Sequence, residues 1–211
     1  MSSAESESSN LPTVYIFIGR SGCGKGTQAK MLSQRLQKTF DKDILYVETG
    51  QRLRKFIEDD SFSGNQAKQL MAEGKRLPAF LAVWTWAQFL IDQVKSSADW
   101  LLFDGTPRSL PEALALETAL LFYGHTRVAV INLQVSREES VKRLTDRGRA
   151  DDRQAELINS RLDWFDSDVA PVIERYYDED LYTYIEIDGE LSPEAIHELL
   201  WDYIRGEDKQ G

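Results

Sequence analysis

Short apolar runs alternate with longer amphipathic stretches along most of the chain. Five runs rich in apolar and β-branched residues predict strands, at residues 13–18, 44–48, 100–104, 127–135 and 183–188. Helical patterns lie between them. Strands that alternate with helices form parallel sheets covered on both faces. The pattern therefore predicts an α/β fold of three layers with a central five-stranded parallel sheet.

The segment between the second and third predicted strands is longer than one crossover requires. It carries helical patterns at 51–59, 64–73 and 79–95, whereas a parallel crossover needs a single helix. We therefore predict a helical insertion over about residues 49–80, within a single domain that spans 13–211. Residues 1–12 open with a Ser- and Glu-rich stretch that lacks an apolar core. We predict a disordered tail there, neither a signal peptide nor a membrane anchor.

The first predicted strand runs into a glycine-rich segment that reads GRSGCGKGTQ from Gly19 to Gln28. Gly19, Gly22 and Gly24 can adopt a positive φ without a Cβ penalty, so that the backbone N–H groups of the loop point inward at a polyphosphate. Lys25 adds a positive charge for the bridging phosphates. Because a strand precedes this loop and a helical pattern follows it, we predict a phosphate-binding loop and a P-loop NTPase-type fold.

The hydroxyl of this loop comes from Thr27, because Gly26 occupies the position directly after Lys25. Gly-Lys-Gly-Thr-Gln resembles the loop of adenylate kinases and other nucleoside monophosphate kinases of the short-lid type. The resemblance implies a helical insertion that binds the nucleoside monophosphate and a short lid over the donor. It also implies a catalytic role for Lys25. The loop residues implied to bind ATP are Gly22, Cys23, Gly24, Lys25, Gly26 and Thr27.

A second segment, which reads ETGQRLR from residue 48 to 54, follows the predicted strand at 44–48. It resembles the Thr-Gly-Asp-x-x-Arg motif of the same kinases, with Gln51 at the position of the usual Asp. The resemblance implies that Thr49 lies beside the acceptor base and that Gly50 also binds the nucleoside monophosphate. It also implies that Arg54 grips the acceptor phosphate, for which a planar guanidinium is well suited.

A third segment places Asp-Gly-Thr-Pro-Arg after the apolar strand at 100–104. Ligands of parallel α/β sheets bind at the carboxyl ends of the strands. In the resembled kinases this motif implies that Gly105 and Arg108 contact the acceptor monophosphate, with Arg108 opposite Arg54 and also catalytic. Asp104 is implied to act through a water on Mg²⁺, and we expect no direct protein ligand to the metal.

Four arginines follow in the order that the resemblance implies. Arg143 and Arg147 are four residues apart and share a helix face, Arg149 lies just beyond a glycine, and Arg161 belongs to a later helix. Arg143, Arg147 and Arg149 are implied to bind ATP, and Arg143, Arg147 and Arg161 to stabilise the transferring phosphoryl group. The lid is very short, at about residues 148–152.

The acceptor base is implied to be read four positions after Arg108, where adenylate kinases have glutamine and this chain has Glu112. A carboxylate only accepts hydrogen bonds, so it matches the two donors on the Watson–Crick edge of guanine better than it matches adenine. Glu112 also follows Pro111 at the start of a predicted helix, where an acid facing water is favoured by the helix dipole. Thr49, by contrast, matches adenylate kinases. Adenylate is the first prediction and guanylate the second.

The composition of the chain limits the classes of partner and cofactor that we expect. The chain has 211 residues, 42% of them hydrophobic, and a formal net charge of -10, which argues against nucleic-acid or anionic-membrane binding. A single cysteine fits a reducing compartment, so we expect a cytoplasmic protein. The same count excludes the zinc-bound lid of some relatives, so Mg²⁺ is the expected cofactor and zinc is not. We expect a monomer.

The sequence thus predicts reversible transfer of the γ-phosphoryl group of Mg-ATP to a nucleoside monophosphate, first of all AMP. Guanylate, UMP/CMP or broad specificity is the alternative. Two other classes remain open at this point. They are a P-loop kinase for a non-nucleotide acceptor and a nucleotide sensor without catalysis.

Overall fold

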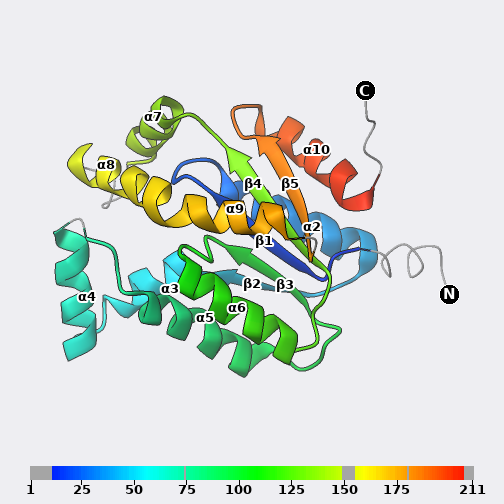
Figure 1. Cartoon of the computed structure of the whole chain (residues 1–211), viewed down its shortest axis with the longest axis horizontal. Helices are drawn as coiled ribbons and strands as arrows, with labels where there is room; N and C mark the ends of the chain where they lie inside the picture. Colours follow the sequence, from blue (N-terminus) through cyan, green and yellow to red (C-terminus); the bar gives the residue numbers. More distant parts are fainter. Residues whose placement is uncertain (1–10, 74, 149–154, 180, 207–211) are drawn as a thin grey trace.

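A five-stranded parallel sheet forms the centre of the computed structural model, which describes residues 11–73, 75–148, 155–179 and 181–206 (Figure 1). The strand order is β2-β3-β1-β4-β5. Each predicted strand is confirmed to within one residue at either end. The bounds are β1 Val14–Gly19, β2 Ile44–Glu48, β3 Trp100–Asp104, β4 Val128–Gln134 and β5 Tyr182–Asp188.

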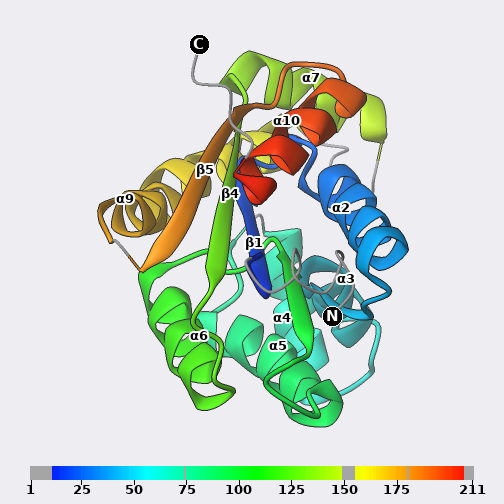
Figure 2. The same ribbon diagram turned by 90° about the vertical axis from the view of Figure 1, so that its right-hand side faces the viewer.

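Helices cover both faces of this sheet, which confirms the three-layer α/β prediction. In Figure 2, α2 and α10 lie on one side of the strands, and α5, α6 and α9 lie on the other. The helix bounds are α2 Lys25–Phe40, α3 Thr49–Phe56, α4 Phe62–Ala72, α5 Ala79–Gln93, α6 Leu110–Phe122, α7 Arg137–Arg147, α8 Ala155–Trp164, the π-helical turn η2 Phe165–Val169, α9 Ala170–Asp178 and α10 Pro193–Arg205.

The central strand β1 is buried on both faces, which explains its uninterrupted apolar sequence. Tyr15 and Phe17 pack toward α2 and α10, whereas Val14, Ile16 and Ile18 pack toward α5, α6 and α9. Successive side chains of a strand point to opposite faces, so one strand contributes to both clusters. Within the described ranges, none of the helices combines the length and apolar character needed to cross a bilayer.

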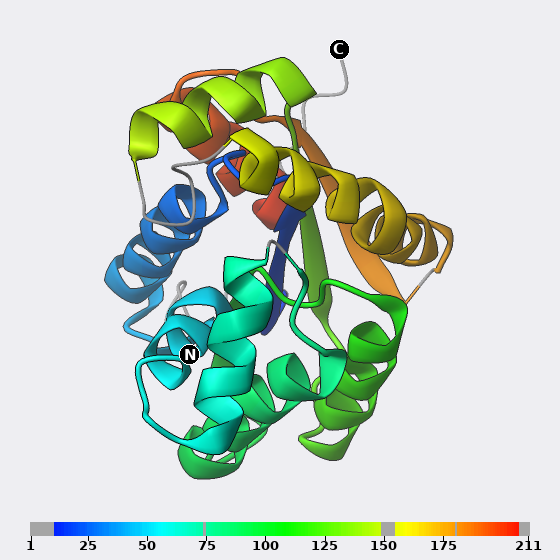
Figure 3. The same cartoon turned by 90° about the vertical axis from the view of Figure 1, so that its left-hand side faces the viewer.

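All carboxyl ends of the strands meet at one edge of the sheet, because every pairing is parallel. Asp104 pairs with Glu48 on one side and with Phe17 on the other. Figure 3 shows α3 and α4 on one side of this edge and α7 and α8 on the opposite side. The helix expected after the phosphate loop begins at Lys25, because Gly24 in the left-handed region turns the chain directly from the loop into the helix.

Candidate active site

A cleft of about 1010 Å³ opens at this edge of the sheet. Its walls come from the loop between β1 and α2, from α3, from the segments after β2 and β3, and from α7 and α8. Most residues singled out by the sequence line it. They are Gly22, Cys23, Gly24, Lys25, Gly26, Thr27, Gly50, Arg54, Asp104, Gly105, Arg108, Glu112, Arg143, Arg147 and Arg161. Arg149 and the rest of the predicted lid beyond Gly148 lie outside the described residues.

The glycine-rich loop has the predicted backbone conformation. Gly19, Gly22 and Gly24 have φ angles of 144°, 89° and 99°. A Cβ at Gly19 would lie 2.5 Å from the carbonyl oxygen of Leu133, so only glycine fits there. Helix α2 then begins without a side-chain cap and without an acid in its first turn. Its first N–H groups and its positive dipole end therefore suit an anion in the cleft.

The ammonium of Lys25 lies against the loop itself. Nζ donates to the carbonyl oxygen of Gly19 at 2.7 Å and to that of Arg20 at 2.8 Å. These two bonds hold a positive charge over the concave side of the loop. The same ammonium can exchange carbonyl partners for phosphate oxygens without a change of backbone.

The carboxylate of Asp104 lies between the loop and strand β2. The hydroxyl of Tyr46 donates to Oδ2 of Asp104 at 3.0 Å, and a Cβ at Gly26 would lie 3.1 Å from the same oxygen. Glycine after the loop lysine thus leaves room for this carboxylate. Burial, reinforced by Asp104, raises the pKa of Tyr46 well above its ordinary value, so its hydroxyl keeps the proton that it donates.

Two arginines from separate motifs converge at Gly50. A Cβ placed there would lie 3.3 Å from Nη1 of Arg54 and 3.5 Å from Nη2 of Arg108. Nε of Arg108 donates to the carbonyl oxygen of Gly105 at 2.6 Å, and Nη2 of Arg54 lies 3.4 Å from Oε1 of Glu48. The pair forms a positively charged corner of the cleft, which suits a dianionic phosphate.

Further arginines approach from the opposite wall. Loss of hydration lowers the pKa of Arg108, Glu112 and Asp104 oppose this shift, and the charges of Arg161 and Arg54 add to it. Arg161 of α8 is therefore close enough to repel Arg108. On α7, Nε of Arg143 donates to Oε1 of Glu139 at 2.6 Å. A second bond of 2.8 Å ties Arg143 to the carbonyl oxygen of Gly189, after β5.

The structure places Thr49 and Glu112 differently from what the sequence motifs predict. Thr49 is buried beneath the wall, where its hydroxyl is 2.5 Å from that of Thr106. Glu112 lies in the first turn of α6, but it is buried and does not face water. Oε2 accepts from the backbone N–H of Arg108 at 2.7 Å, and Oε1 has no hydrogen-bond partner among the described residues. The alternative interpretation of Glu112 as a helix-start acid that faces water is therefore wrong, because α6 packs this turn against the sheet.

Sequence reasoning missed a set of ion pairs around the π-helical turn between α8 and α9. Asp168 pairs with Arg76, which lies between α4 and α5 and lines the cleft. Asp166 pairs with Arg20 beside the phosphate loop at 2.7 Å, and Asp163 pairs with Arg137 of α7 at 2.7 Å. Three acids close together in the sequence thus join three separate segments.

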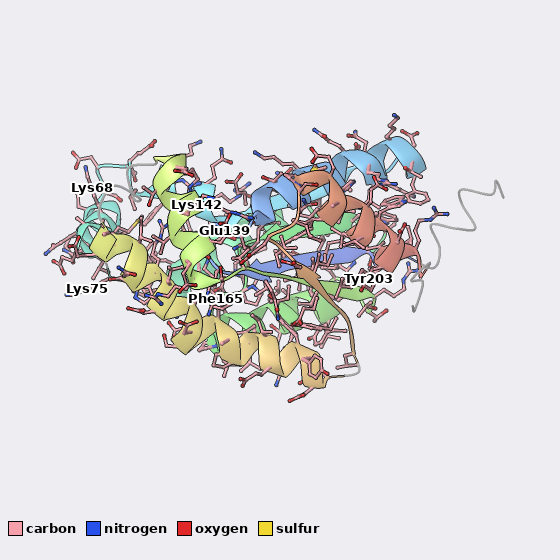
Figure 4. All side chains as sticks on the ribbon, turned by 90° about the horizontal axis from the view of Figure 1, so that it is seen from above. Lys68, Lys75, Glu139, Lys142, Phe165 and Tyr203 are labelled. Carbon is pink, nitrogen blue, oxygen red and sulfur yellow. The ribbon has the colours of Figure 1, made fainter. Side chains whose placement is uncertain are left out.

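Side chains of the helical insertion between β2 and β3 also line the cleft. Lys68 and Lys75 line the cleft, and Figure 4 shows them at the end of the molecule where α8 begins. In the same view, Glu139 and Lys142 lie on α7, beside the helix that carries Phe165.

Across the described ranges, no three His, Cys, Asp or Glu side chains gather as a group that could hold a metal ion.

Comparisons with known proteins give one consistent result. A family model described as adenylate kinase matches residues 17–181. Adenylate kinase 1 of Synechocystis sp. is 39% identical over 181 residues, which cover 86% of this chain and 91% of that protein. Adenylate kinase 1 of Nostoc sp. is 35% identical over 188 residues, or 89% and 96% of the two chains. Adenylate kinase of Corynebacterium glutamicum (strain R) is 35% identical over 176 residues, or 83% and 91%.

Burial of Glu112 predicts a pH dependence of stability. Desolvation raises the pKa of its carboxyl. The hydrogen bond from the Arg108 N–H and the charges of Arg108 and Arg76 oppose this shift without cancelling it. The folded pKa therefore exceeds the unfolded value of about 4.3, so the stabilisation is complete below that value and is lost as pH rises through the folded pKa. Glu112→Gln should remove this loss, measured by urea unfolding between pH 4 and 8.

The control is Glu58→Gln, which changes an exposed acid outside the cleft. Its unfolding free energy should follow the parent across the same pH range. Each unit of raised pKa corresponds to about 1.4 kcal/mol once the carboxyl ionises. A constant difference between the parent and Glu112→Gln at all pH values would contradict the prediction.

Proposed function

This chain belongs to the adenylate kinase family, and we infer from its cleft how it transfers the γ-phosphoryl group of Mg-ATP reversibly to AMP. Relatives named adenylate kinase align with most of its length. They favour AMP over guanylate, CMP or UMP as the acceptor. They also favour a phosphotransferase over a nucleotide sensor or a kinase with a non-nucleotide acceptor.

The acceptor phosphate is proposed to bind between Arg54 and Arg108. The observation that carries this assignment is the approach of both guanidinium groups to Gly50. Two guanidinium groups offer more donors than the three oxygens of a phosphate need, and they neutralise its charge. Glu48 lies 3.4 Å from Arg54 and keeps its guanidinium beside this corner of the cleft.

The donor phosphates are proposed to bind in the loop from Gly22 to Thr27. The start of α2, which has neither a side-chain cap nor an acid in its first turn, and the ammonium of Lys25 support this assignment. Arg143 and Arg147 are proposed to contact the donor from α7, since both line the same cleft. We extend this proposal to Arg149 on the strength of its place in the sequence.

Transfer requires little covalent chemistry from the protein. An AMP phosphate oxygen is already an anion, so no general base is needed. Lys25, Arg108, Arg143, Arg147 and Arg161 are proposed to hold the two phosphates in line and to stabilise the charge that spreads over the transferring group. The approach of Arg161 to Arg108 supports this role, because it brings cations from both walls to one region.

Asp104 fits the Mg²⁺ that accompanies ATP. Its carboxylate and the hydroxyl of Thr27 are hard oxygen donors beside the loop, which is the chemistry that Mg²⁺ prefers. When bound, the ion neutralises charge on the donor phosphates. Asp104 is proposed to orient it through a water and not as a direct ligand.

Closure over both substrates is proposed to involve the insertion at about 49–80 and the short lid at about 148–152, within one domain. Closure excludes water from the transferring phosphoryl group. The proposed form is a cytoplasmic monomer, because the single cysteine and the net charge of -10 fit that setting. A coupled assay with Mg-ATP against AMP, GMP, CMP and UMP tests the function directly. AMP should give the highest kcat/KM.

Lys25→Ala should lower kcat for AMP phosphorylation by at least about a hundredfold, because the loss of a phosphate-directed charge costs several kcal/mol in the transition state. The coupled assay measures the rate, and thermal unfolding checks the fold. Lys38→Ala removes an exposed lysine from the last turn of the same helix and should leave kcat unchanged. Activity of Lys25→Ala within about tenfold of the parent, or ~1.4 kcal/mol, would exclude the assigned role.

Arg54→Ala and Arg108→Ala should each raise KM for AMP and lower kcat, with ATP affinity within about twofold of the parent by calorimetry. The reason is the proposed loss of one guanidinium from the acceptor phosphate. Lys55→Ala is the matched control, since Lys55 neighbours Arg54 but lies outside the cleft. Loss of ATP binding alone would mean that these arginines serve the donor.

Glu112→Gln should shift the AMP-to-GMP ratio of kcat/KM toward AMP by more than about tenfold. The amide would offer adenine N1 a donor, and guanine N1–H would lose its acceptor; a pairing of this kind is worth roughly 1–3 kcal/mol. Glu117→Gln is the control, because Glu117 lies on the same helix but bonds to Arg175 away from the cleft. An unchanged ratio would assign base selection to other residues.

A further inference from the structure

Tyr46 is a residue of strand β2 that the phosphate chemistry does not use directly. It lies two positions before Glu48, which is the β2 partner of Asp104. Residues two apart on a strand share a face, and a tyrosine reaches a diagonal neighbour on the adjacent strand. The register therefore brings the Tyr46 hydroxyl to the end of β3.

Oδ2 of Asp104 is enclosed by two fixed groups. The hydroxyl of Tyr46 donates to it at 3.0 Å. On the other side, a Cβ at Gly26 would lie 3.1 Å from the same oxygen, so the start of α2 closely approaches it. Rotation of the carboxylate is limited, and the orientation of Oδ2 determines where Oδ1 faces in the cleft that Asp104 lines.

We propose that Tyr46 is a positioning residue, whose hydroxyl holds the Asp104 carboxylate in the orientation that receives a water of the Mg²⁺–ATP complex. The inference rests on the proposed role of Asp104. A hydrogen bond to an ionised carboxylate is roughly twice as strong as one between neutral groups, so it can select one rotamer. Without the hydroxyl, the carboxylate samples orientations that do not meet the bound ion.

A packing role for Tyr46 is the competing explanation, because the ring also contacts the hydrophobic cluster on the α2 face. Tyr46→Phe separates the two roles, since it keeps the ring and removes the donor. Tyr184→Phe is the matched control. Tyr184 is half-buried on the opposite edge strand β5, and its hydroxyl bonds to Asn132 and Glu186 away from the main cleft.

The measurement is the dissociation constant of ATP with and without Mg²⁺, by calorimetry and without AMP, so that no turnover occurs. In Tyr46→Phe the gain in affinity from Mg²⁺ should fall at least threefold, while the affinity for metal-free ATP stays within twofold. Tyr184→Phe should match the parent, and Asp104→Ala should lose most of the gain. In the coupled assay, kcat of Tyr46→Phe should fall while KM for AMP does not change.

An unchanged Mg²⁺ gain in Tyr46→Phe, together with a reduced gain in Asp104→Ala, would overturn the role of Tyr46 and leave that of Asp104 intact. An unchanged gain in Asp104→Ala would overturn both. Incorporation of 4-aminophenylalanine at position 46 keeps the ring and a donor. It should restore the parent gain even where the phenylalanine variant folds poorly, and failure to restore it in a folded protein would refute the inference.

Discussion

Like charges held close together are the main constraint on this molecule. Arg54, Arg108 and Arg161 line one cleft from three segments. Loss of hydration lowers the pKa of Arg108, the charges of Arg161 and Arg54 add to this shift, and Glu112 and Asp104 oppose it. Repulsion of this kind opposes assembly of the cleft before any phosphate arrives. Burial of the sheet on both faces compensates for this repulsion, because the two hydrophobic clusters hold the strand ends in place. Arg54 and Arg108 lie within a few residues of the ends of β2 and β3, so burial elsewhere in the molecule holds the cations in place.

Several cations of the cleft bond to a local acceptor. Lys25 bonds to loop carbonyls, Arg108 to the carbonyl of Gly105, and Arg143 to Glu139. These acceptors are carbonyl and carboxylate oxygens, and phosphate oxygens accept the same hydrogen bonds. A phosphate in the cleft can therefore take their place without a change of backbone. The cleft is organised in advance and remains free to exchange partners.

The ion pairs at and just before the π-helical turn connect parts of the structure that surround the cleft. Asp168 reaches Arg76 of the insertion, Asp166 reaches Arg20 beside the phosphate loop, and Asp163 reaches Arg137 at the start of α7. π-helical turns are rare and frequently occur at functional sites. Asp166 and Asp168 belong to this turn and Asp163 lies in the last turn of α8, so one short segment meets three others. These ion pairs join the insertion, the phosphate loop and α7 through one short segment.

Local conformation is what the sequence by itself determined. The five strands, the positive φ angles of the phosphate loop and the start of α6 depend on residues adjacent in the chain, so propensity and spacing predicted them. The burial of Glu112, the hydroxyl of Tyr46 on Asp104 and the pairing of Arg76 with Asp168 were not predictable in this way. The last two contacts join residues 58 and 92 positions apart. Strand register and helix packing decide such contacts, because a side chain's environment is set by elements that are distant in the sequence and meet only in the folded core.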